Sequence, residues 1–74
     1  MYGFEICEED VYIALQEMGV TEVERFQNIA EDIVIDHSSR VEDAALAGDD
    51  MDEQCEYAIK EIKKIIKEDH SDIL

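Results

Sequence analysis

Apolar residues recur every three or four positions along most of the chain, a spacing typical of helices with one buried face. The pattern is strongest near the C-terminus, where the apolar face consists of Met51, Cys55, Ala58, Ile59, Ile62, Ile65 and Ile66. Asp50 and Glu53 stand where an N-cap residue and its capping partner stand, and acids fill the first turn. Four lysines lie in the later turns, and Glu56 and Lys60 form an i,i+4 pair. The sequence therefore predicts that the longest helix begins near Met51.

A first helix is predicted over residues 8–18. Three acids in its first turn suit the positive end of the helix dipole, and Cys7 occupies the N-cap position. Gly19 follows the last apolar position, where a helix often closes in the left-handed conformation that glycine tolerates. Ahead of this helix, Phe4 and Ile6 alternate with polar residues, which indicates a short extended N-terminal arm.

Two helices are predicted between these ends. The stretch Thr21 to Glu24 has the pattern of a capping box, and it leads into an apolar face that continues to a helix end near residues 36–38. That face consists of Val23, Phe26, Ile29, Ala30, Ile33 and Val34. Ser39 to Glu42 is a second capping box, opening a short helix that ends at Gly48, a second candidate for left-handed closure. Its apolar positions are Val41, Ala44, Ala45 and Leu46.

The fold class that follows is all-α, a small bundle of three to four helices in one acidic domain over residues 1–74. The chain contains no proline and no internal repeat or linker. No stretch approaches the run of about 18 apolar residues that a membrane span needs, and no signal peptide is evident. We therefore expect an intracellular, cytoplasmic protein without membrane contact. Cys7 and Cys55 are expected as thiols, with a single bridge as the lesser alternative.

The net charge of −15 is unevenly distributed along the chain. Residues 1–59 hold 17 of the 21 acidic side chains but only Arg25 and Arg40, whereas residues 60–74 balance four acids with four lysines. A field of this sign opposes direct contact with nucleic acid or anionic lipid and favours encounter with basic surfaces. A basic protein is therefore the expected class of partner.

Metal and catalytic chemistry find little support in the spacing of polar residues. Asp50, Asp52, Gln54 and Glu61 match positions 1, 3, 5 and 12 of an EF-hand loop, but Cys55 stands where that loop needs glycine. The candidates for zinc are Cys7, His37, Cys55 and His70, and no two have the spacing of a zinc finger. The stretch HSSRVEDAAL is partly similar to the modified-serine region of acyl carrier proteins but departs from their Asp-Ser-Leu motif at both flanks. We expect neither an enzyme nor a bound cofactor or metal.

The remaining feature is the acidic surface. Helical carboxylates three or four residues apart form rows spaced about 4.5 to 6 Å, comparable with the phosphates of one DNA strand at about 7 Å. The sequence therefore suggests a virus-encoded inhibitor, of the anti-CRISPR or anti-restriction type, that binds a basic nucleic-acid-binding protein by mimicking phosphate charge. The candidate partner-binding residues are Glu31, Asp32, Asp36, Glu42, Asp43, Asp49, Asp50, Asp52 and Glu53. The alternative is a homodimeric interaction or scaffold protein that associates through the isoleucines of the last helix and uses its acids only for solubility.

Overall fold

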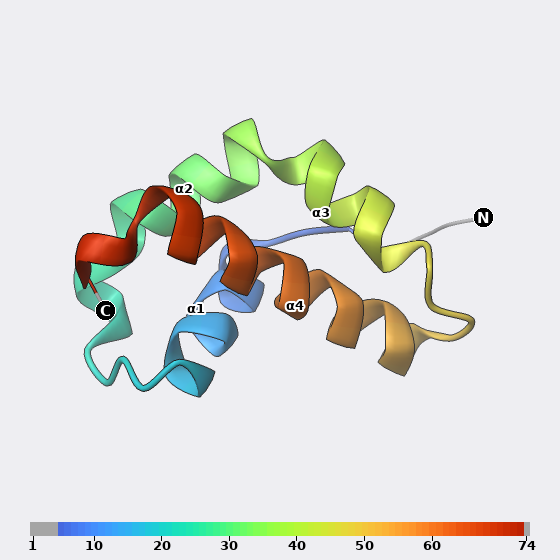
Figure 1. Cartoon of the computed structure of the whole chain (residues 1–74), viewed down its shortest axis with the longest axis horizontal. Helices are drawn as coiled ribbons and strands as arrows, with labels where there is room; N and C mark the ends of the chain where they lie inside the picture. The colour runs from blue at the N-terminus through green and yellow to red at the C-terminus, as the bar shows by residue number, and fades with distance from the viewer. Residues whose placement is uncertain (1–4, 74) are drawn as a thin grey trace.

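The computed structural model describes residues 5–73, and its helices confirm the all-α prediction. They are α1 (Glu8–Glu17), the 3₁₀ turn η1 (Val23–Phe26), α2 (Gln27–Asp36), α3 (Ser38–Ala45), α4 (Met51–Asp69) and the 3₁₀ turn η2 (Ser71–Ile73). In Figure 1, α2 and α3 follow one another along the top of the molecule, α4 crosses in front, and α1 lies below. The structure measures 35 × 21 × 19 Å. The long α4 packs mainly against α3 and α1, whereas α2 packs mainly against α1.

The core is aliphatic, as the apolar spacing predicts, and every helix contributes to it. Among the described residues, the fully buried large side chains are Val11, Leu15, Ile33, Val41, Ile62, Ile65 and Ile66. Buried alanines of α1, α2, α3 and α4 let the helix backbones approach closely. Burying each large aliphatic side chain stabilises the fold by about 1.5 to 3 kcal/mol. The apolar face of α4 is therefore largely buried within the single chain.

The N-terminal arm is extended where the structure describes it. Cys7 has φ −141° and ψ 169°, and Ile6 is buried against the core. The Ile6 backbone N–H donates to the Glu42 carboxylate at 3.4 Å, which fastens the arm to α3. Phe4, the other residue expected to face inward, lies outside the described residues.

The two predicted capping boxes at Thr21 and Ser39 do not form. The chain enters α2 through η1, which begins after Glu22, because this tight turn places Val23 in the core while Thr21 stays exposed. In α3 the first residue is Ser38, so Ser39 already lies inside the helix. Its would-be capping partner, Glu42, bonds to the N-terminal arm instead.

The two glycines that follow helices have different roles. Gly19 has φ +96° and closes α1 in the left-handed region, as predicted. For Gly48 that prediction is wrong, since Gly19 is the glycine with positive φ in the described chain. A Cβ at Gly48 would lie 2.6 Å from the Gln54 backbone N, so glycine is needed there because the α3–α4 turn presses on the first turn of α4.

The ends of two predicted apolar faces are wrong as well. Leu46 and Met51 flank the α3–α4 turn and are 63% and 61% exposed. The third helix ends at Ala45 rather than at Gly48. Leu46 is its C-cap residue and its N–H still donates to the Glu42 carbonyl, so it keeps the helical register, but its side chain is not part of the core. Met51 keeps the register of α4, but it lies at the edge of the bundle beyond the core residues.

Candidate functional site

The candidate site is the acidic strip, defined as the nine predicted partner-binding residues on α2, α3, the α3–α4 turn and the start of α4. α2 and α3 follow one another along one long edge of the molecule and lead into the α3–α4 turn, so the backbone segments that carry the strip residues extend along that edge (Figure 1). Within residues 5–73, none of its nine carboxylates forms an ion pair with a lysine or arginine. Among the basic side chains of the described residues, only His70 pairs with a strip carboxylate, that of Asp32, so lysine and arginine leave the strip uncompensated.

The α2 part of the strip brings two carboxylates together. Asp32 and Asp36 lie one helical turn apart. The hydrogen bond that Asp36 makes with the Asp32 carboxylate, and then the charge of Asp32, raise the pKa of Asp36 above the ordinary aspartate value. Like charges held this close favour the protonated form of one partner. The pair concentrates negative charge that no lysine or arginine of the described chain pairs with, although the charge of His37 partly offsets the rise in the pKa of Asp36.

Both histidines of the chain lie against aspartates at this end of the strip. His37, between α2 and α3, has its Nε2 3.4 Å from Asp69 Oδ2, and His70, after α4, has its Nε2 3.8 Å from Asp32 Oδ2. These crosswise contacts join the α2–α3 junction to the end of α4. In the part of the chain that the structure describes, no group of three or more histidines, cysteines or acids is arranged to hold a metal ion.

At the other end of the strip, two acids stabilise the start of α4. The Asp50 carboxylate accepts from the Glu53 N–H at 2.9 Å, and the Glu53 carboxylate accepts from the Asp49 N–H at 2.8 Å. The predicted N-cap of α4 is therefore confirmed. The side chains of Asp49 and Asp52 are exposed beside this cap and remain accessible to a partner.

Other members of the strip face different neighbours. Glu31 accepts from the Gln27 amide, and its charge adds to the partial burial that raises the pKa of Tyr12 on α1. Glu42 bonds to the arm, and Asp43 is exposed. The structure therefore gathers the strip into an α2 group and an α4 group with exposed acids between them, rather than into one continuous patch.

The ion pairs that arginine and lysine form in the described chain are all with acids outside the strip. Arg40 on α3 donates to Glu61 and Glu68 on α4, and these hydrogen bonds raise the pKa of Arg40 and lower that of Glu68. Lys63 on α4 donates to Glu17 on α1 at 2.6 Å. Ion pairs therefore connect the two parts of the chain in both directions: Lys63 of residues 60–74 compensates Glu17, and Arg40 of residues 1–59 compensates Glu61 and Glu68.

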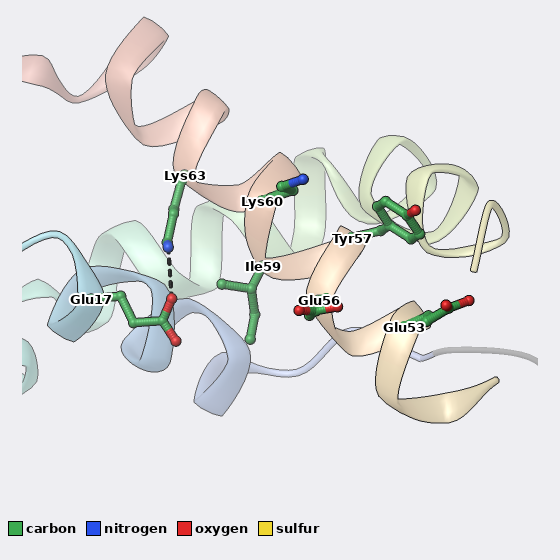
Figure 2. A pocket seen from close by; sticks show the side chains of 7 residues that line it. All are labelled: Glu17, Glu53, Glu56, Tyr57, Ile59, Lys60 and Lys63. Carbon is green, nitrogen blue, oxygen red and sulfur yellow. Dashed lines mark hydrogen bonds and ion pairs between the residues drawn. The ribbon is translucent and has the colours of Figure 1, made fainter. Parts of the chain in front are cut away.

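A depression of about 280 Å³ lies on the outer side of α4, where α1 ends beside it. Figure 2 shows Ile59 between the Glu17–Lys63 pair on one side and Glu56 on the other, with Glu53 further along the helix. The predicted Glu56–Lys60 ion pair is not among the pairs of the described chain. Instead the Lys60 ammonium lies 5.7 Å from the centre of the Tyr57 ring, within the range of a cation–π contact.

The two cysteines are free thiols, Cys7 exposed and Cys55 half-buried, as expected from the sequence. Partial burial is the main factor that raises the pKa of the Cys7 thiol, and the neighbouring Asp10 carboxylate adds to it. The Asp10 carboxylate accepts from the Cys7 N–H at 3.0 Å and so caps α1. Cys7 therefore serves helix initiation, and its thiol is disfavoured as a nucleophile.

Sequence spacing does not reveal the pocket of α4 or the histidine contacts. Asp69 and Glu56 resemble ordinary helix-surface acids, and only the packing of α4 against α1 and α3 brings them beside their neighbours. Across the described residues, none of the helices combines the length and apolar composition of a membrane span. No protein-family model matches the sequence, and comparisons with curated proteins and with solved structures find no similar chain.

Proposed function

We propose that the protein is a non-enzymatic binding module whose acidic strip occupies a basic, nucleic-acid-binding surface of another protein by mimicking phosphate charge. In its specific form the proposal is a virus-encoded inhibitor of a nucleic-acid-processing defence protein, of the anti-CRISPR or anti-restriction type. The supporting observation is the missing internal compensation: none of the nine strip carboxylates forms an ion pair with a lysine or arginine of the described chain. Such a surface gains electrostatic free energy when a basic partner covers it.

The spacing along the strip suits this role. α2 and α3 follow one another along a molecule 35 Å long, so the backbone positions of their acids extend along much of that length (Figure 1). That length is close to one turn of B-DNA, about 34 Å. A basic groove that holds one turn of duplex would therefore contact the strip from α2 to the start of α4.

The test is a capture experiment with a charge-neutralised variant. The variant carries Glu31→Gln, Asp36→Asn, Asp43→Asn and Asp52→Asn, four exposed acids that bond to no backbone N–H. Immobilised wild-type protein is exposed to an extract of the host cell, and bound proteins are released with duplex DNA or RNA. We expect basic nucleic-acid-binding proteins in that eluate, and at least a tenfold loss from the variant.

A matched control separates specific recognition from net charge. It removes the same number of charges from exposed acids outside the strip, by Glu5→Gln, Glu9→Gln, Glu24→Gln and Asp72→Asn. The control variant should retain the captured proteins. Equal losses from both variants, or bound proteins that nucleic acid fails to release, would contradict mimicry by the strip.

The homodimer alternative needs a different surface from the one first expected. Ile62, Ile65 and Ile66 are fully buried inside the single chain, so they are not accessible to a second copy. Sedimentation at increasing protein concentration would detect association through any other surface. No contact in the structure favours that alternative over the acidic strip.

A further inference from the structure

We propose that the depression on α4 is a binding site for an arginine side chain of the basic partner. The ligand class is a guanidinium group on an aliphatic stem. The inference rests on the proposed function because a basic, nucleic-acid-binding partner would supply the arginine. It extends that function beyond the strip to the outer side of α4: Glu53 belongs to both the strip and the pocket, and the other lining residues lie outside the strip.

The pocket combines an apolar floor with a carboxylate that lacks an internal partner. Ile59 is half-buried at its centre, between the Glu17–Lys63 pair and Glu56 (Figure 2). Within the described chain, Glu56 takes part in no ion pair and no side-chain hydrogen bond. An arginine stem lying on Ile59 would therefore carry its guanidinium to Glu56.

The two lysines of the pocket are held away from Glu56. The Lys63 ammonium donates to Glu17 at 2.6 Å, and the Lys60 ammonium lies over the Tyr57 ring. Because Lys60 takes this position, it leaves unused the i,i+4 pairing with Glu56 that its place on the helix would permit. The Glu56 carboxylate is thus available to an external cation in spite of the nearby lysines.

Arginine suits this site better than lysine for geometric reasons. A guanidinium presents two parallel N–H donors to one carboxylate, whereas an ammonium offers a single point charge. Its planar, weakly hydrated head also costs less to place beside an apolar surface such as Ile59. The volume of about 280 Å³ holds one such side chain and leaves the ion pair of Glu17 and Lys63 intact as one wall.

The experiment uses the full chain and two small probes, N-acetyl-arginine methylamide and N-acetyl-lysine methylamide. Backbone amide shifts are followed by NMR as each probe is added. We expect saturable shifts from the arginine probe, concentrated at residues 53–60 and at Glu17, with at least threefold tighter binding than the lysine probe. Glu56→Gln should weaken arginine binding at least fivefold, while Glu24→Gln on η1 should change it less than twofold.

Equal binding of both probes, shifts spread over all acidic residues, or unchanged binding by Glu56→Gln would overturn the proposal. Both substitutions are at exposed positions, and circular dichroism verifies that each variant is folded. The four-fold strip variant separates this inference from the proposed function, because it should bind the arginine probe like wild type. Loss of captured proteins with retained probe binding would show that the strip acts independently of the pocket. Unchanged capture with unchanged probe binding would contradict the proposed function and leave the arginine site standing, and loss of probe binding by this variant would overturn the arginine site.

Discussion

At the scale of single residues, repulsion between neighbouring acids destabilises the folded state. Asp36 lies beside Asp32, and their hydrogen bond and mutual repulsion raise the pKa of Asp36. The folded state therefore holds this proton more tightly than the unfolded chain does. The resulting stabilisation is fully present below the ordinary aspartate pKa of about 4 and is lost as the pH rises through the raised value. At neutral pH the ionised pair opposes folding.

We expect Asp36→Asn to raise the melting temperature at pH 7, because it removes one of two adjacent negative charges. The gain should shrink as the pH falls below about 4, where Asp36 of the wild type is already protonated. Thermal unfolding followed by circular dichroism at both pH values measures the difference. Asp43→Asn removes the same charge from an exposed site on α3 and serves as the control. A gain for Asp36→Asn no larger than that of the control would exclude pair repulsion.

Among the elements, α4 organises the rest of the molecule. Its 19 residues supply four buried side chains, the partners of Arg40 and all of the pocket lining except Glu17. Its N-terminus is secured by the Asp50 carboxylate, which accepts from the Glu53 N–H, by the Glu53 carboxylate, which accepts from the Asp49 N–H, and by the close approach of Gly48. The other three helices have 8 to 10 residues each, and helices of that length are marginal in isolation. Their stability therefore depends on docking, of α1 and α3 against α4 and of α2 against α1.

Removing the N-cap of α4 should destabilise the whole protein. Asp50→Ala leaves the Glu53 N–H without its acceptor, and we expect the free energy of unfolding to fall by about 1 kcal/mol. Asp49→Ala changes the neighbouring exposed acid, whose side chain makes no described hydrogen bond, and should shift stability by less than about 0.5 kcal/mol. Urea denaturation at 25 °C compares the two. Equal effects would mean that the cap contributes little beyond its charge.

The whole molecule combines a small aliphatic core with a strongly negative surface. A core of this size supports only about 3 to 5 kcal/mol of stability, and self-repulsion of the −15 net charge reduces it. Arg40 and Lys63 offset part of that repulsion by joining α3 and α1 to α4. The acidic strip has no such partners, so its repulsion would be relieved when a basic surface covers it.

A substitution at the buried C-terminal half of α4 should unfold much of the protein, because its total stability is small. Ile66→Ala empties a fully buried position, and we expect it to cost about 2 to 5 kcal/mol, enough to unfold much of the protein at 25 °C. Ile35→Ala changes an isoleucine that is 74% exposed on α2 and should cost less than about 0.5 kcal/mol. Urea titrations of both variants give the comparison. Similar losses would show that Ile66 is not part of a packed core.

The acidic strip was predictable as a set of residues, but its arrangement was not. Helical spacing alone places Asp32 and Asp36 one turn apart and puts Asp50 at a helix start, since these relations depend on neighbours within a few residues. The partners of Glu42 and Asp32 come from the N-terminal arm and the end of α4, far along the chain. No local pattern encodes such contacts.

The sequence by itself determined the helical class, the long α4 with its cap, the aliphatic core and the excess of negative charge, because periodicity, capping and composition act locally. Tertiary structure alone decided that η1 replaces the Thr21 capping box, that Leu46 and Met51 stay exposed, and that the isoleucines are buried within one chain. It also decided which acids are compensated. The physical reason is that burial and ion pairing depend on which helices pack together, and contacts between residues far apart in the sequence determine that packing.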